Sequence, residues 1–164
     1  MIYEFCAENF TLIEKAMEAG ARRIELCDNL AVGGTTPSYG VTKAAVELAA
    51  NYETTIMTMI RPRGGDFVYT NQEVAIMLDD IRLTAQAGSQ GVVFGALTAD
   101  NKLDKFNLEK LIAASNGMEI VFHMAFDELS DQDQLEAIDW LSQAGVQRIL
   151  TRAGVSGDSL EKRF

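Results

Sequence analysis

Short apolar segments alternate with amphipathic helical windows along the whole chain, and this alternation is the feature that most constrains the fold. Three helical windows end in an Ala-Gly pair that leads into the next apolar segment, at Ala19-Gly20, Ala87-Gly88 and Ala144-Gly145. Glycine suits the left-handed position just after a helix. From Gly20 to Gly145 the chain passes through four units, so one unit averages 125/4, about 31 residues. This period is typical of repeated βα units around a parallel sheet.

Six segments have the composition and length of buried strands. They are residues 2–7, 23–27, 54–60, 91–95, 119–124 and 148–151. Apolar residues at helical spacing predict covering helices in three further places. The stripes are Leu12, Ile13, Ala16 and Met17, then Val41, Ala44, Ala45 and Leu48, then Val74, Met77, Leu78 and Ile81. Thr70-x-x-Glu73 and Ser130-x-x-Asp133 resemble capping boxes, and the second precedes a helix that ends near Gln143.

These units predict an α/β fold, a (β/α)₈ TIM-type barrel with about six βα units in this chain. A complete barrel typically needs about 250 residues, and the last helical window, residues 159–164, stands where a sixth helix would lie. We therefore expect a single barrel domain over residues 1–164 that is incomplete at the C-terminus. A flavodoxin-like open sheet also fits this length, but its first turn is normally Gly-rich, and Ala7-Glu8-Asn9 holds no glycine.

Acidic side chains outnumber basic ones by 24 to 14, which gives a formal net charge of −10. This charge repels phosphate backbones and anionic membrane surfaces, so we expect neither nucleic acid nor a membrane as partner. No apolar stretch approaches the roughly 18 residues of a membrane span, and the first strand begins right after Met1, without a leader. We expect a cytoplasmic protein, in which cysteines remain thiols.

The same Glu-x-Cys triplet occurs in the first two predicted strands, and the two copies hold both cysteines of the chain, Glu4-Phe5-Cys6 and Glu25-Leu26-Cys27. Side chains two residues apart on a strand share a face. If the segments are adjacent parallel strands, two carboxylates and two thiols line one patch. Burial of such groups is costly, so this patch is the first place to look for function.

Cys6 and Cys27 suit a two-thiolate site for a soft ion such as Cu(I), with help from the thioethers of Met57 or Met59. Free cysteine also packs as a small hydrophobe, the pair lacks a Cys-x-x-Cys spacing, and the methionines alternate as core residues do. A closed zinc site needs four ligands, and the single histidine makes zinc the weaker interpretation. A copper site and simple packing both remain open.

Further polar residues suit acid–base chemistry. Glu4 and Glu25 fit either a closely spaced carboxylate pair, one with a raised pKa, or a structural ion pair neutralised by Arg61. His123 stands at a predicted strand end, four residues before Asp127. It fits a general base or a ligand whose tautomer the carboxylate sets, or else a hydrogen-bonded histidine that fills the barrel mouth. Both interpretations of each group remain open.

Arg61 and Arg63 stand in a loop that also contains Gly64-Gly65, and a second glycine pair, Gly33-Gly34, follows the second strand. Arginine presents forked donors that match a carboxylate or phosphate. Loops after the strands of a βα barrel meet at its C-terminal face, so these residues predict one pocket there. An anionic or polyhydroxylated ligand fits such a pocket.

The loop sequences resemble the CutC family, whose members were grouped as copper-homeostasis proteins and adopt a (β/α)₈ barrel. The matching blocks span most of the chain. They are Glu25-Leu26-Cys27 with Gly33-Gly34-Thr35-Thr36-Pro37-Ser38, residues 59–69 from Met59-Ile60-Arg61 to Tyr69, Val93-Phe94-Gly95-Ala96-Leu97, and Phe122-His123-Met124-Ala125-Phe126-Asp127. The resemblance implies a copper-homeostasis role, with Cu(I) as the ion at the barrel mouth.

Two classes of function follow, with overlapping residues. The first is a cytosolic protein that binds Cu(I) through Cys6 and Cys27. The second is a barrel enzyme that acts on a small polar metabolite, in which Arg61 and Arg63 orient the substrate while the acid–base residues move protons. Those residues are Glu4, Glu25, His123 and Asp127. A scaffold whose loops bind a partner protein is a third class. The edges of an incomplete sheet favour self-association, so we expect a homo-oligomer.

Overall fold

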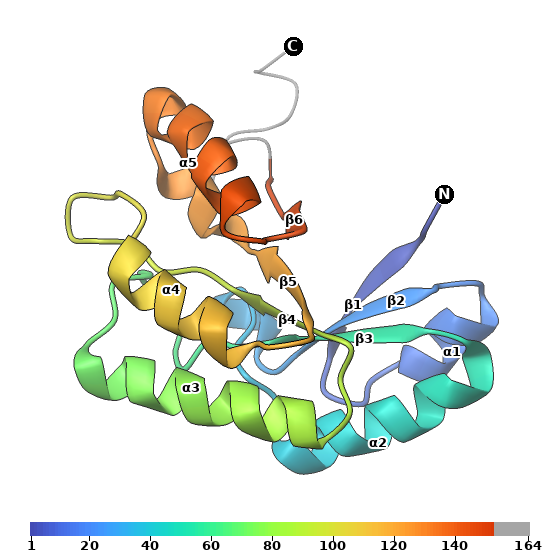
Figure 1. Cartoon of the computed structure of the whole chain (residues 1–164). Coiled ribbons are helices and arrows are strands. Elements are labelled where there is room, and N and C mark those ends of the chain that lie inside the picture. Colours follow the sequence, from blue (N-terminus) through green and yellow to red (C-terminus); the bar gives the residue numbers. More distant parts are fainter. Residues whose placement is uncertain (153–164) are drawn as a thin grey trace.

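Six parallel strands form one curved sheet whose spatial order is the order of the sequence, β1-β2-β3-β4-β5-β6, in the computed structural model, which describes residues 1–152 (Figure 1). The strands are β1 (Glu4–Glu8), β2 (Arg23–Cys27), β3 (Thr55–Met59), β4 (Gly91–Phe94), β5 (Glu119–Phe122) and β6 (Arg148–Ile149). A flavodoxin-like sheet changes direction after its first strand. Sequential order is the pattern of a βα barrel, here as a curled half-barrel.

The helices follow the strands in alternation and lie on the outer side of the sheet (Figure 1). They are α1 (Ile13–Glu18), α2 (Tyr39–Ala49), α3 (Asn71–Gln86), α4 (Lys105–Ala114) and α5 (Asp131–Gln143), with short 3₁₀ helices η1 (Leu30–Val32), η2 (Ala50–Tyr52) and η3 (Met124–Glu128). None of the helices in residues 1–152 has the length and apolar character needed to cross a membrane. The predicted helix at 159–164 lies outside the described residues.

All six predicted strands are confirmed, with shorter bounds at several ends. Ile2 and Tyr3 are exposed and precede β1, because the strand pairing begins only at Glu4. The predicted second stripe is shifted, since Thr42, Ala45 and Ala49 form the buried face of α2. Helix α4 was not among the predicted helices; its apolar face is short, with Leu108 and Leu111 as its buried apolar residues.

Local sequence signals set the helix ends as predicted. Thr70 and Glu73 form a complete capping box at the start of α3. Ser130 caps α5 by accepting a hydrogen bond from the backbone N–H of Asp133, but the carboxylate of Asp133 binds Lys102 and the Ser130 hydroxyl instead of completing the box. Gly20, Gly88 and Gly145 have φ of 101°, 87° and 86°. These are the left-handed positions expected after a helix.

The sheet separates two apolar regions. Alternate residues of the strands point outward and pack under the helices, among them Ile24, Ile56 and Val92. The other alternates point inward, where a smaller cluster contains Cys27, Met57, Met59, Val93 and Val121. The sulfur-containing side chains of Cys27, Met57 and Met59 thus face inward. This inner face is where the predicted polar patch lies.

Candidate metal centre

The Glu-x-Cys triplets meet as expected, because β1 and β2 are adjacent and parallel. Cys6 stands opposite Glu25 in the register, so Glu25 lies between the two thiols. The Sγ atoms of Cys6 and Cys27 lie 3.5 and 3.7 Å from the same atom, Oε1 of Glu25. One ligand atom from each residue lies within 4.8 Å of the others. We call Cys6, Glu25 and Cys27 the Cys–Glu–Cys group.

Burial differs across the Cys–Glu–Cys group. Cys27 is fully buried and Glu25 is 6% exposed, whereas Cys6 on the edge strand is exposed. Burial raises the pKa of Glu25, the neighbouring Glu4 raises it further, and hydrogen bonds from the two thiols oppose the rise. Contact with the Cys6 thiol, then burial and the charge of Glu25, raise the pKa of the Cys27 thiol. The Cys27 thiol is therefore a protonated donor to Glu25 in the metal-free protein.

Glu4 belongs to a different part of the inner face. It is the first residue of β1, opposite Arg23, and its carboxylate lies 3.5 Å from Arg23 and 3.9 Å from Arg148. Glu119 completes a ring of four charges, 3.9 Å from Arg23 and 3.4 Å from Arg148. All four begin their strands, so this charged ring lies at the N-terminal end of the half-barrel. The predicted neutralisation of Glu4 comes from Arg23 rather than from Arg61.

A hollow of about 500 Å³ lies beside the Cys–Glu–Cys group. Its walls include Glu4, Cys6, Glu25, Met124 and Arg152. The two inner methionines point elsewhere. Met57 packs against Gly91, where an added Cβ would lie 2.6 Å from its Sδ, and Met59 is fully buried in the inner cluster. They fill the core, as one of the two interpretations expects. Cys6 and Met124 supply the sulfur atoms on the walls of the hollow, whereas Cys27 is fully buried.

His123 is fully buried at the C-terminal end of β5, with its ring 4.9 Å from that of Phe67. Its Nδ1 accepts a hydrogen bond from the backbone N–H of Ala125 at 3.2 Å, so Nε2 carries the proton in the neutral ring. Among the described residues, Nε2 has no partner. Burial and the charge of Arg61 lower the pKa of His123 to about 3. The ring is therefore neutral at physiological pH, and its role stays a prediction.

Asp127 does not set the tautomer of His123 as expected. Its carboxylate accepts hydrogen bonds from the Thr151 hydroxyl and, at 2.9 Å, from the backbone N–H of Arg152. The side chain is 3% exposed and ties the end of β6 to η3. The tautomer is set by Ala125, because the backbone turns at His123 and presents that N–H to Nδ1.

Arg61 is buried, 2% exposed, and its guanidinium is taken up by backbone carbonyls. It donates to Val32 at 2.7 Å, Gly34 at 3.0 Å and Gly65 at 2.8 Å, and it lies 4.8 Å from the ring centre of Phe67. These bonds join the loop after β2 to the loop after β3. Arg61 also lines a hollow of about 430 Å³ together with Gly65 and Phe67, so its predicted role in substrate orientation stays a prediction.

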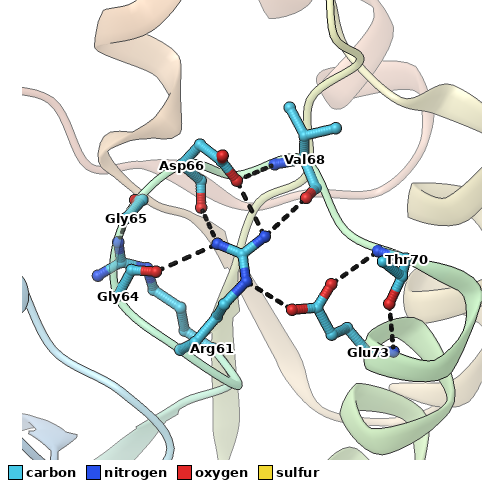
Figure 2. Close-up of polar contacts among 8 residues, drawn as sticks. Arg61, Gly64, Gly65, Asp66, Val68, Thr70 and Glu73 are labelled. Carbon is cyan, nitrogen blue, oxygen red and sulfur yellow. Dashed lines mark hydrogen bonds and ion pairs between the residues drawn. The ribbon is translucent and has the colours of Figure 1, made fainter.

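Arg63 organises the loop between β3 and α3, whose contacts are drawn in Figure 2. Its guanidinium forms ion pairs with Asp66 and Glu73 and donates to the carbonyl of Val68 at 2.8 Å. Glu73 in turn accepts from the backbone N–H of Thr70 in the capping box. Arg63 therefore fixes the start of α3, and it has the surroundings of a structural residue rather than of a ligand-binding one.

The candidate residues thus divide into separate places. Cys6, Glu25 and Cys27 converge on the inner face. Glu4 lies in the charged ring at the N-terminal end of the strands. His123 and Asp127 lie at the C-terminal end of the strands and have hydrogen-bond partners of their own. Sequence reasoning missed the ring partners Arg23, Glu119 and Arg148. The alternation Arg23-x-Glu25-x-Cys27 places Arg23 on the inner face and was a signal that could have found it.

Sequential parallel strands, outer helices and polar residues on the inner face define a protein of the TIM-type barrel class. An archaeal fructose 1,6-bisphosphate aldolase has the same arrangement, with a TM-score of 0.61 and 14% identity over 85% of this chain and 53% of that one. A likeness at this identity concerns the fold alone.

The family is defined by closer matches. The model of the CutC family matches residues 1–163, so the chain belongs to the CutC family. CutC proteins from Enterococcus faecalis and Streptococcus pyogenes are 52% and 50% identical, over 100% and 92% of this chain and 78% and 72% of their own lengths. The crystal structure of a CutC from Streptococcus agalactiae, whose name associates it with copper homeostasis, has a TM-score of 0.95 and 44% identity. That match covers 99% of this chain and 77% of the other.

Proposed function

We propose that this protein serves copper homeostasis by binding one Cu(I) ion between the thiolates of Cys6 and Cys27. The observation that carries the proposal is the convergence of two thiols on one side of adjacent strands, within 4.8 Å of each other and of Glu25. Thiolates are soft ligands that select Cu(I) over hard divalent ions. The name of the Streptococcus agalactiae relative also refers to copper.

The residues fit this ion in number, chemistry and access. Metal–thiolate bonds are about 2.3 Å long for zinc, so two thiolates that share an ion of similar size lie about 4.6 Å apart. The ligand atoms of the Cys–Glu–Cys group lie within 4.8 Å of one another, which is close to this separation. Glu25 is positioned to accept hydrogen bonds from the thiols before binding. The exposed thiol of Cys6 offers the first contact for an arriving ion.

A competition titration tests the proposal. Reduced protein is titrated anaerobically with Cu(I) in the presence of a chromophoric chelator, and the wild-type protein is expected to withdraw one equivalent. Cys6→Ser, Cys27→Ser and the double variant should each lose that equivalent. Met59→Leu is the matched control, because it removes a buried sulfur of the same inner cluster while keeping its volume. Copper binding that survives both cysteine substitutions would refute a thiolate site.

Both cysteines are free thiols, which suits a reducing compartment such as the cytoplasm. Acid–base catalysis has weaker support. Glu4 begins its strand at one end of the half-barrel, whereas His123 and Asp127 lie at the other end with hydrogen-bond partners of their own. A small polar ligand of the hollow remains compatible with copper binding, but no observation favours a reaction there.

A further inference from the structure

Access to the two proposed copper ligands is unequal, because a loop lies over one of them. Residues 29–36, which we call the covering loop, connect β2 to α2. An atom added at the Cβ position of Gly34 would lie 3.0 Å from Sγ of Cys27, so the backbone of this residue packs directly on the thiol. Gly33 and Gly34 both have φ of 89°, a conformation that glycine adopts without strain. The close approach that buries Cys27 thus depends on glycine at position 34.

Arg61 holds the covering loop in place. Its Nη1 donates to the carbonyls of Val32 and Gly34, the residues on either side of Gly33. Its main chain adds two bonds to Thr36, since its N–H donates to the Thr36 hydroxyl and its carbonyl accepts from the Thr36 N–H, each at 2.9 Å. Nη2 reaches across to Gly65 at 2.8 Å. One side chain therefore connects the loop above Cys27 to the next loop of the barrel.

Arg61 donates its side-chain hydrogen bonds to uncharged backbone carbonyls. In residues 1–152 no carboxylate forms an ion pair with it, and its Nε has no partner. The guanidinium is held by carbonyls and by the ring of Phe67. Water can replace a carbonyl as an acceptor, whereas it would not replace a buried carboxylate as easily. Such a set of bonds can open and close without leaving a buried carboxylate unpaired.

We propose that Arg61 is a latch that holds the covering loop closed over Cys27 and so sets the rate at which copper reaches the second thiolate. This inference rests on the proposed function for the identity of the ion, but the latch itself concerns access to a thiol. Copper would meet the exposed Cys6 first and would join Cys27 after the loop moves. Arg61 is in this account a positioning residue and does not touch the ion.

The test measures access to Cys27 without any metal. In a Cys6→Ser background, Cys27 is the sole thiol, and its rate of reaction with an aromatic disulfide is followed by release of the coloured thiolate. Arg61→Lys keeps the charge but replaces the fork by a single point donor. Loss of one charge-assisted hydrogen bond changes an opening equilibrium by about tenfold or more, so the rate should rise at least that much. A rate that stays unchanged or falls would overturn the latch.

Two further variants keep the test decisive. Thr36→Val removes one bond between Arg61 and the loop and leaves the guanidinium intact, so it should raise the rate by a smaller factor. If Arg61→Lys does not fold, an unchanged rate in Thr36→Val overturns the proposal. Arg63→Lys is the matched control, because that arginine serves the neighbouring loop and donates to neither Gly34 nor Val32. It should leave the rate of Cys27 unchanged.

If Arg61 acted only through its positive charge, Arg61→Leu would lower the reaction rate of Cys27 instead of raising it. In Arg61→Leu the loss of a positive charge disfavours the thiolate and slows the reaction, while loss of the latch speeds it. A net rise in this variant therefore reports access alone. Copper loading is measured in parallel on the intact dithiol protein, where Arg61→Lys should shorten the time to bind Cu(I). Faster thiol reaction without any copper binding would refute the proposed function and leave the latch standing.

Discussion

Cys6 on β1 and Glu25 on β2 stand opposite each other in the strand register, and the thiol of Cys6 donates a hydrogen bond to Oε1 of Glu25 at 3.5 Å. Side chains alternate along a strand, so this pairing also brings Cys27, two residues after Glu25, to the same face. The convergence of the Cys–Glu–Cys group is thus a consequence of how two strands separated by α1 pair. A slip of one residue would turn the Cys6 thiol outward, under the helices.

Substitution of Glu25 should change how stability depends on pH. Burial raises the pKa of Glu25 above 4.5, so the folded state holds the proton more tightly than the unfolded state. The stabilisation of the folded state by the protonated Glu25 is complete below pH 4.5 and is lost as pH rises through the pKa of Glu25 in the folded protein. Glu25→Gln does not titrate, so its stability relative to wild type should increase from pH 4.5 upward. Urea unfolding of the metal-free proteins across pH 4 to 8 measures this, and a constant difference would contradict it.

The separation of the two cysteines along the strands bears on their oxidation. Cys6 stands opposite Glu25 on the neighbouring strand, and Cys27 follows Glu25 by two residues. The Cα atoms of Cys6 and Cys27 are therefore about 8 Å apart. A disulfide needs Cα atoms closer than about 7 Å. We expect the folded protein to resist internal disulfide formation under a mild thiol oxidant. Mass spectrometry after alkylation should find two free thiols, and a loss of two mass units in the native state would refute the prediction.

His123 should remain neutral well into the acidic range. The pKa of about 3 arises from complete burial and from Arg61. Because the unfolded ring titrates near 6.5, stability falls as pH drops below 6.5 and continues to fall toward pH 3, by up to about 5 kcal/mol. It is the single histidine of the chain, so its ring resonances in an NMR titration are unambiguous. A midpoint near 6.5 in the folded protein would contradict the buried placement.

We expect the edge strands of the half-barrel to favour association between copies of this chain. Within residues 1–152, β1 pairs only with β2 and β6 only with β5. An apolar hollow of about 400 Å³ adjoins the β1 edge, with Tyr3, Phe5 and Leu12 on its walls. Unpaired strand edges beside apolar surface are sites of association between chains. Light scattering should show a mass above 18.0 kDa that falls on dilution, and a monodisperse monomer at all concentrations would count against this.

Much of the fold could be predicted from the sequence, because each βα unit carries its own local signals. Apolar alternation identified all six strands, and the glycines after α1, α3 and α5 marked the helix ends. Strand order followed from the barrel pattern. The inner face was harder, since which carboxylate meets which arginine depends on strand register. Glu4 was therefore grouped with Arg61 instead of with Arg23, its neighbour across the sheet.

Part of the candidate site could also be predicted, because side chains alternate along strands. The repeated Glu-x-Cys triplet was enough to place Cys6, Glu25 and Cys27 together. The sequence did not distinguish an arginine that binds a ligand from one that binds the backbone, and Arg61 and Arg63 do the latter. Loop conformation decides this difference, and it depends on positive φ at glycines such as Gly34, which only the folded chain reveals.

X-ray absorption at the copper edge tests the central claim most directly, because it reports the atoms bound to the ion. Protein loaded anaerobically with one equivalent of Cu(I) should show a first shell of two sulfur atoms. Cys27→Ser should reduce that shell to one sulfur, whereas Met59→Leu should leave it unchanged. A first shell of nitrogen or oxygen in the wild-type protein, or a sulfur shell unaffected by Cys27→Ser, would contradict a copper site between Cys6 and Cys27.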